Sequence, residues 1–119
     1  MPEISRFKQL VDDAKKRVRE ISPSDAATQQ QKGALLIDVR EADDFAKSHA
    51  QGAIHLSKGV LELKIEETVP DVASPIICYC GGGSRSALAA ENLQKMGYTN
   101  VSSMAGGFRD WKNTGLPTT

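Results

Sequence analysis

The chain has 119 residues, of which 39% are hydrophobic and 25% charged, and this suits one globular domain with a single core. Fifteen basic and fifteen acidic residues cancel, so no overall positive field attracts nucleic acid or an anionic membrane. No apolar stretch approaches the roughly 18 residues of a membrane span, and the first residues lack the apolar core of a signal peptide. We therefore expect a cytoplasmic protein that binds neither membrane nor nucleic acid.

The first predicted element is an amphipathic helix over residues 4–18. Its apolar residues recur at spacings of three and four: Ile4, Phe7, Leu10, Val11, Ala14 and Val18. The basic residues near its end are interleaved with acids, which is typical of a solvated helix face. The apolar face has two possible roles, because it can pack on the core of the domain or form a dimer contact.

A strand over 18–22 and a helix are expected next, and the start of that helix is marked by three residues. Ser22 fits the N-cap, Pro23 the first helical position and Asp25 the capping-box position, with Gly33 ending the helix after about Gln31. The pattern of the later residues predicts strands at 34–39, 52–57, 74–80 and 100–105, and helices at 41–48, 59–69, 85–96 and 106–115. In the helix at 85–96, the inward side chains should be Leu88, Leu93 and Met96.

Strands and helices alternate throughout, which predicts an α/β fold with a mainly parallel central sheet and helices on both faces. We divide the chain into an N-terminal helical extension, residues 1–19, and one domain, residues 20–119. The two cysteines, Cys78 and Cys80, lie too close in sequence for an ordinary structural disulfide, and free thiols in a reducing compartment fit better.

The most informative stretch is CGGGSRS, residues 80–86. Cys80 ends a buried strand, three glycines follow, and a helix begins near Ser84 or Arg85. Ligands of open α/β sheets bind outside the carboxyl ends of strands. Successive N–H groups of a glycine-rich turn, with the N-terminus of a helix, can surround an anion. The alternative is a tight turn without chemistry, but turn formation alone does not require three glycines before an arginine.

The same loop predicts a reactive sulfur. A helix N-terminus or a nearby cation lowers the pKa of a cysteine from about 8.5, so Cys80 should be largely thiolate at neutral pH and nucleophilic without a histidine. Cys78 lies inside the apolar strand on the same sheet face and should be buried and inert. Two cysteines without a nearby histidine are a poor ligand set, so no metal is expected.

The loop resembles the active-site pattern C-x-x-G-x-R-[ST] of the rhodanese family, with Cys80, Gly83, Arg85 and Ser86 at the patterned positions. Three further segments resemble family motifs in the expected order: LLIDVRE at 35–41, SHAQGAIHL at 48–56 and AGGFRDWKNTGLP at 105–117. The similarity covers roughly residues 20–117. It implies a single-domain, rhodanese-like fold and a thiosulfate sulfurtransferase-like activity.

The resemblance also implies a mechanism. The Cys80 thiolate takes sulfane sulfur from a small donor such as thiosulfate or a persulfide and passes it to a thiol or cyanide, with no cofactor. Six residues would bind the substrate sulfur: Gly81, Gly82, Gly83, Ser84, Arg85 and Ser86. Asp38 and Arg40 would orient the loop through hydrogen bonds, while Glu41 either joins them or begins a helix, which we favour.

Arg85 has two further possible roles, and the other side chains near these motifs are expected to be structural. Arg85 can point away from the loop to steer donor anions, or pair with an acid. His49 should make a backbone hydrogen bond, His55 should lie in a strand, and Trp111 should anchor the last helix in the core.

Two other functions remain open at this point. Cysteine phosphatases of related fold have five residues between the cysteine and the arginine, whereas four lie between Cys80 and Arg85, which suits one sulfur atom better than a phosphate. A persulfide carrier, or a module that binds a partner without turnover of small molecules, also needs an intact cysteine. The N-terminal helix could then dock a protein sulfur acceptor or a second copy of the chain.

Overall fold

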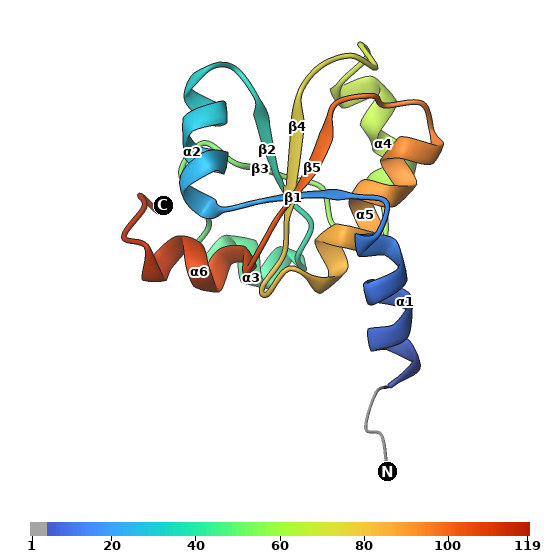
Figure 1. Ribbon diagram of the computed structural model, residues 1–119. Helices are drawn as coiled ribbons and strands as arrows, with labels where there is room; N and C mark the ends of the chain where they lie inside the picture. The colour runs from blue at the N-terminus through green and yellow to red at the C-terminus, as the bar shows by residue number, and fades with distance from the viewer. Residues whose placement is uncertain (1–4) are drawn as a thin grey trace.

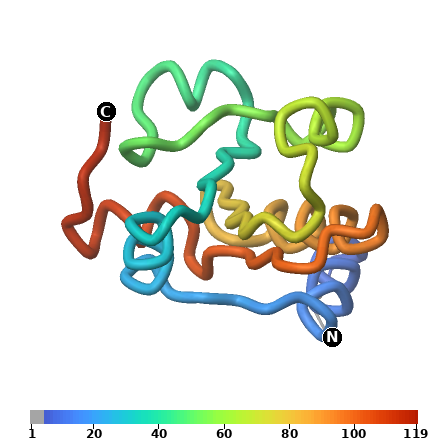
Figure 2. Tube along the Cα trace, turned by 90° about the horizontal axis from the view of Figure 1, so that it is seen from above, coloured from blue at the N-terminus to red at the C-terminus, as the bar shows by residue number. Residues whose placement is uncertain are grey.

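One parallel sheet of five strands runs through the centre of the protein. The structure is a computed structural model and describes residues 5–119. The strands are β1 (Arg19–Ile21), β2 (Leu35–Asp38), β3 (Ile54–His55), β4 (Ile76–Tyr79) and β5 (Val101–Met104). They lie in the order β1-β5-β4-β2-β3, and every paired neighbour is parallel. In Figure 2, the segments of β1 and β3 lie at opposite margins of the molecule.

Helices cover both faces of this sheet, as the alternating pattern predicts. They are α1 (Arg6–Lys15), α2 (Pro23–Gln31), α3 (Ala42–Lys47), α4 (Leu61–Thr68), α5 (Ser84–Lys95) and α6 (Gly107–Asn113). Figure 1 shows α2 and α6 on one side of the strands and α1, α4 and α5 on the other. Within residues 5–119, no helix is long and apolar enough to cross a membrane.

The two faces of the sheet carry separate apolar clusters. Cys78 and Cys80 belong to the cluster beneath α4 and α5, together with Leu93. Tyr79 and Trp111 belong to the cluster beneath α2 and α6. This alternation along β4 confirms that the two cysteines share one face of the sheet.

Local signals place several helix ends as expected. The Oγ of Ser22 accepts a hydrogen bond of 3.1 Å from the N–H of Asp25, and Pro23 occupies the first turn of α2. Gly33 and Gly97 follow α2 and α5 with positive φ angles of 109° and 101°. Glu41 is the N-cap of α3, so the prediction that it begins a helix is confirmed.

The first helix differs from its prediction. The helix α1 begins at Arg6 rather than at residue 4, and Ile4 lies outside the described residues. Val18 is buried but precedes β1 instead of belonging to the helix. Phe7 and Leu10 are 49% and 55% exposed, because α1 contacts α5 and buries only Val11 and Ala14. Figure 1 shows its first turns projecting beyond the sheet.

Two smaller expectations were also wrong. Met96 is the C-cap of α5 and is 37% exposed, since Leu93 and Tyr98 fill the core at this end of the helix. The strand expected over 52–57 is reduced to two residues, Ile54–His55, at the edge of the sheet.

Candidate active site

Cys80 directly follows β4, and its sulfur lies under the turn that leads into α5. The N–H groups of Gly83 and Ser86 point at the Sγ of Cys80, at 3.1 Å and 3.4 Å. Gly83 is the N-cap of α5 with φ of 101°, a left-handed conformation that is unfavourable for residues other than glycine. The loop therefore folds as a backbone cradle around one atom, which is the arrangement its glycines predict.

A pair of hydroxyl groups lies behind the sulfur. The Oγ of Ser86 is 3.6 Å from the Sγ of Cys80 and 2.8 Å from the Oγ of Ser103 on β5. All three residues are at most 1% exposed. Each hydroxyl can donate one proton, so Ser86 can donate to an ionised sulfur while Ser103 donates to Ser86.

The pKa values of the two cysteines are shifted in opposite directions. Burial raises the pKa of Cys78 to about 12, and the neighbouring Cys80 adds to the rise, so Cys78 stays a neutral thiol. Burial also acts against ionisation of Cys80. It is outweighed by the Ser86 hydroxyl and by the N–H groups of Ser86, Gly83 and Gly82, and the pKa of Cys80 lies below its ordinary value. Cys80 therefore ionises more readily than Cys78.

The first turn of α6 is hydrogen-bonded to the backbone of the cysteine loop. The N–H groups of Phe108 and Arg109 donate to the carbonyls of Cys80 and Gly81, at 2.8 Å and 3.1 Å. A Cβ on Gly107 would lie 2.7 Å from the carbonyl carbon of Gly81 and closer still to the carbonyl oxygen of Cys80. Gly107 is therefore needed for the close approach of the two segments, in addition to its φ of 57°.

The other loop residues form the outer rim of the cradle. Gly81 is half-buried, Gly82 is exposed, and Ser84 opens α5. Arg85 is half-buried, and its Nη2 lies 3.8 Å from where a Cβ on Gly81 would stand. Its guanidinium thus lies next to Gly81, and no described ion pair contains it.

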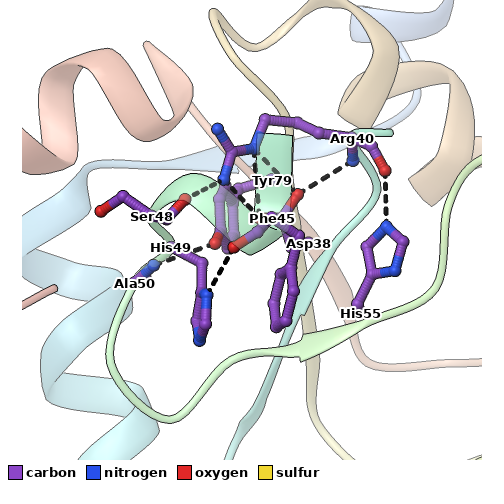
Figure 3. Close-up of polar contacts among 8 residues, drawn as sticks. All are labelled: Asp38, Arg40, Phe45, Ser48, His49, Ala50, His55 and Tyr79. Carbon is purple, nitrogen blue, oxygen red and sulfur yellow. Dashed lines mark hydrogen bonds and ion pairs between the residues drawn. The ribbon is translucent and has the colours of Figure 1, made fainter. Parts of the chain in front are cut away.

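Asp38 and Arg40 form a buried ion pair (Figure 3), and Asp38 pairs with Tyr79 at the end of β4. The Nη2 of Arg40 donates to Asp38 at 2.8 Å and to the carbonyl of Ser48 at 2.7 Å. None of the described side-chain hydrogen bonds of this pair reaches residues 80–86. They therefore do not support the expectation that Asp38 and Arg40 orient the loop through hydrogen bonds. The pair contacts the loop indirectly, through Phe108. The Arg40 guanidinium lies 4.4 Å from the ring centre of Phe108, and the N–H of Phe108 donates to the carbonyl of Cys80.

Both histidines contact backbone carbonyl oxygens, as Figure 3 shows. His49 Nδ1 contacts the carbonyl oxygen of Phe45 at 2.8 Å, and His55 Nε2 contacts that of Arg40 at 2.7 Å. Trp111 is 1% exposed in the core, as expected. Within residues 5–119, no group of three or more His, Cys, Asp or Glu side chains is placed to hold a metal.

Three residues around the cradle were missed from the sequence: Ser103, Gly107 and Phe108. The adjacent glycines Gly106 and Gly107 were an available signal for a close backbone approach. Nothing local marks Ser103, since its contact with Ser86 depends on the pairing of β4 with β5.

Comparisons with known proteins agree with this geometry. A family model described as a rhodanese-like domain matches residues 22–114. The thiosulfate sulfurtransferase GlpE of Haemophilus influenzae is 43% identical over 83% of this chain and 92% of its own length. A solved Rhodopseudomonas palustris protein of unknown function, described as a possible tyrosine phosphatase, superposes with a TM-score of 0.87 at 26% identity, covering 100% of this chain and 99% of its own. The polysulfide-sulfur transferase homodimer of Wolinella succinogenes superposes with a TM-score of 0.83 at 30% identity, covering 95% and 86%.

Proposed function

The chain belongs to the rhodanese-like family, and on that premise we propose that it transfers sulfane sulfur through a persulfide on Cys80. The observation that carries the proposal is the convergence of the Gly83 and Ser86 N–H groups on the Cys80 sulfur. These donors stabilise a thiolate before the reaction, and they can stabilise the anionic outer sulfur after it. Family membership identifies the substrates as a sulfur donor and a thiol-type acceptor.

Two displacements make up the cycle. The Cys80 thiolate attacks the outer sulfur of the donor, a new S–S bond forms, and the old S–S bond breaks with its electron pair on the leaving group. Curated relatives are named thiosulfate sulfurtransferases. With thiosulfate as the donor, the leaving group is sulfite. An acceptor thiolate or cyanide then attacks the terminal sulfur, and the Cys80 thiolate is released. Neither step requires a proton acceptor in the protein.

A turnover assay tests this proposal. Wild-type protein supplied with thiosulfate and cyanide should form thiocyanate, and Cys80→Ala should form none. Cys78→Ala is the matched control, because Cys78 is fully buried in the same strand and should retain most of the activity. Equal loss in both variants would contradict the assignment of the nucleophile.

A phosphatase is the second candidate, because the solved Rhodopseudomonas palustris protein is described as a possible tyrosine phosphatase. The loop of this chain argues against that activity here, since its N–H groups already lie 3.1 Å and 3.4 Å from the sulfur itself. A bound phosphate needs donors around several oxygens beyond the sulfur. Hydrolysis of p-nitrophenyl phosphate that disappears in Cys80→Ala would favour the phosphatase over the sulfurtransferase.

A persulfide carrier differs from an enzyme only in turnover. It would accept one sulfur on Cys80 and release it to a partner protein, without passing it to small thiols or cyanide. One equivalent of persulfide with no catalytic thiocyanate formation would favour the carrier. Repeated turnover supports the enzyme.

We propose that residues 1–19 are an extension outside the catalytic domain of residues 20–119, and that α1 pairs with a second copy of the chain. The family match over residues 22–114 leaves α1 outside, which supports the division. Phe7 and Leu10, one turn apart, expose apolar surface, and a relative that aligns with 95% of this chain is described as a homodimer. Sedimentation should give a dimer that Phe7→Ser/Leu10→Ser converts to a monomer. A monomeric wild type would contradict the pairing and favour a protein sulfur acceptor as the partner.

The cytoplasm is the location that we propose for this chemistry. Both cysteines are free thiols in the structure, and a thiolate nucleophile must stay reduced between cycles. Fractionation of the cells that express the protein tests this proposal.

A further inference from the structure

Two arginines from different helices border the outer face of the cysteine loop. The backbone N–H of Arg109, in the first turn of α6, donates to the carbonyl of Gly81 at 3.1 Å, which fixes the position of this residue beside the loop. Its Nη1 lies 3.9 Å from where a Cβ on Gly82 would stand. The Nη2 of Arg85, from α5, lies 3.8 Å from the corresponding point on Gly81. The space left empty by the two glycines is thus bordered by two guanidinium groups.

The terminal nitrogens of both arginines are available to a ligand. Among the described residues, Arg85 takes part in no ion pair, and Arg109 has one, from Nε to Asp110 at 3.5 Å. The side chains of Arg109 and Asp110 are 68% and 45% exposed, so water screens this pair and it holds Arg109 weakly. No hydrogen bond in the described part of the chain uses the Nη atoms of Arg109.

Two neighbouring cations, Arg40 and Lys112, are already engaged. The Arg40 guanidinium is bound to Asp38 and to the carbonyl of Ser48. The Nζ of Lys112 lies 4.9 Å from the ring centre of Phe108, where the ring already attracts it. By contrast, no described hydrogen bond uses the terminal nitrogens of Arg109 and Arg85, and both lie at the loop. A guanidinium is always charged, and its fork of N–H groups matches an oxyanion.

We propose that Arg109, together with Arg85, binds the oxyanion half of a dianionic sulfur donor while its outer sulfur reaches Cys80. Thiosulfate is the simplest donor of this class, so the inference rests on the sulfurtransferase function proposed above. As the S–S bond of the donor breaks, its electron pair leaves with the sulfite, and the two guanidinium groups stabilise this charge. Arg109 thus adds to Arg85 a second positive charge, which comes from α6, outside the cysteine loop.

The test compares two donors that differ in charge. Thiosulfate carries an oxyanion group, whereas the persulfide of 2-mercaptoethanol carries none beyond its reacting sulfur. In Arg109→Gln, the KM for thiosulfate should rise roughly tenfold, since a hydrogen bond to a charged group is removed. The rate with the mercaptoethanol persulfide should change less than about twofold. Arg109→Lys, which keeps the charge, should recover part of the loss.

Lys95→Gln is the matched control, because it removes the same charge from the last turn of α5, at the far end of that helix. It should leave both donors unaffected. An unchanged KM for thiosulfate in Arg109→Gln, or an equal loss with both donors, would overturn the role of Arg109 while leaving the sulfurtransferase intact. A wild-type protein that takes sulfur from neither donor would instead overturn the proposed function, and this inference with it.

Discussion

The side-chain oxygen of Ser103, on β5, lies 2.8 Å from the side-chain oxygen of Ser86, in the first turn of α5. Ser86 is also the hydroxyl neighbour of Cys80, at 3.6 Å from the sulfur. When the sulfur is ionised, Ser86 gives its only proton to it and needs another donor for its own oxygen. Ser103 is placed to be that donor, so a residue far from the loop in sequence can direct the Ser86 hydroxyl toward the thiolate.

Ser103→Ala should raise the pKa of Cys80. The variant removes a hydroxyl that can keep the Ser86 hydroxyl directed at the sulfur, and a weaker hydrogen bond to the thiolate favours the neutral thiol. The pH profile of iodoacetamide alkylation, measured in a Cys78→Ala background, should therefore move toward higher pH. Ser102→Ala is the control, because Ser102 bonds to Arg19 instead. A profile that moves equally in both variants, or in neither, would contradict the hydroxyl relay.

Gly107→Ala should disable the site. A Cβ at this position meets the carbonyl carbon of Gly81 at 2.7 Å, so the cysteine loop and the first turn of α6 must move apart. Displacement of a reacting group by about 1 Å can cost about 100-fold in rate. Steady-state sulfur transfer should fall by about that factor.

Gly115→Ala separates the clash from backbone strain. Gly115 also has a positive φ, 81°, but a Cβ at this position would meet no heavy atom within 4 Å, so only the left-handed backbone is penalised. This control should lose about 1–2 kcal/mol of stability and keep its activity. Comparable activity in the two variants would show that the contact between α6 and the loop is dispensable.

Asp38→Asn should destabilise the whole fold. It leaves the Arg40 guanidinium buried without its counter-charge, and breaking a buried pair in this way costs about 3–5 kcal/mol. Urea unfolding measures the loss. Asp12→Asn removes half of an exposed pair with Lys8 and should change little. A loss no larger than that of the control would mean that the Asp38–Arg40 pair contributes nothing to stability.

Local patterns were sufficient for most of the fold. The N-cap at Ser22, the glycine stops and the strand that ends in Cys80 each depend on neighbours in the sequence, and all were predicted. The exposure of Phe7 and Leu10 was not, because it depends on how much of α1 packs against α5. The exposure of Met96 was not, because Tyr98 fills the core beside it.

The same distinction applies to the site. The cradle from Cys80 to Ser86 is a local turn, and its glycines, arginine and following helix marked it in the sequence. Ser103 and Gly107 reach the cradle only because β5 pairs with β4 and α6 then returns across the loop. Local sequence patterns do not predict strand order, so the contacts of Ser103 and Gly107 could be found only in the three-dimensional structure.

The central claim is that Cys80 carries the transferred sulfur, and the mass of the intact protein tests it most directly. Three proteins are compared: the wild type, Cys78→Ala and Cys80→Ala. Each is incubated with thiosulfate or with a small persulfide, and its intact mass is then measured by mass spectrometry without a reducing agent. The account predicts a mass increase of one sulfur atom in the wild type and in Cys78→Ala, reversed by cyanide, and no increase in Cys80→Ala. One added sulfur in Cys80→Ala, or none in the wild type with either donor, would contradict it.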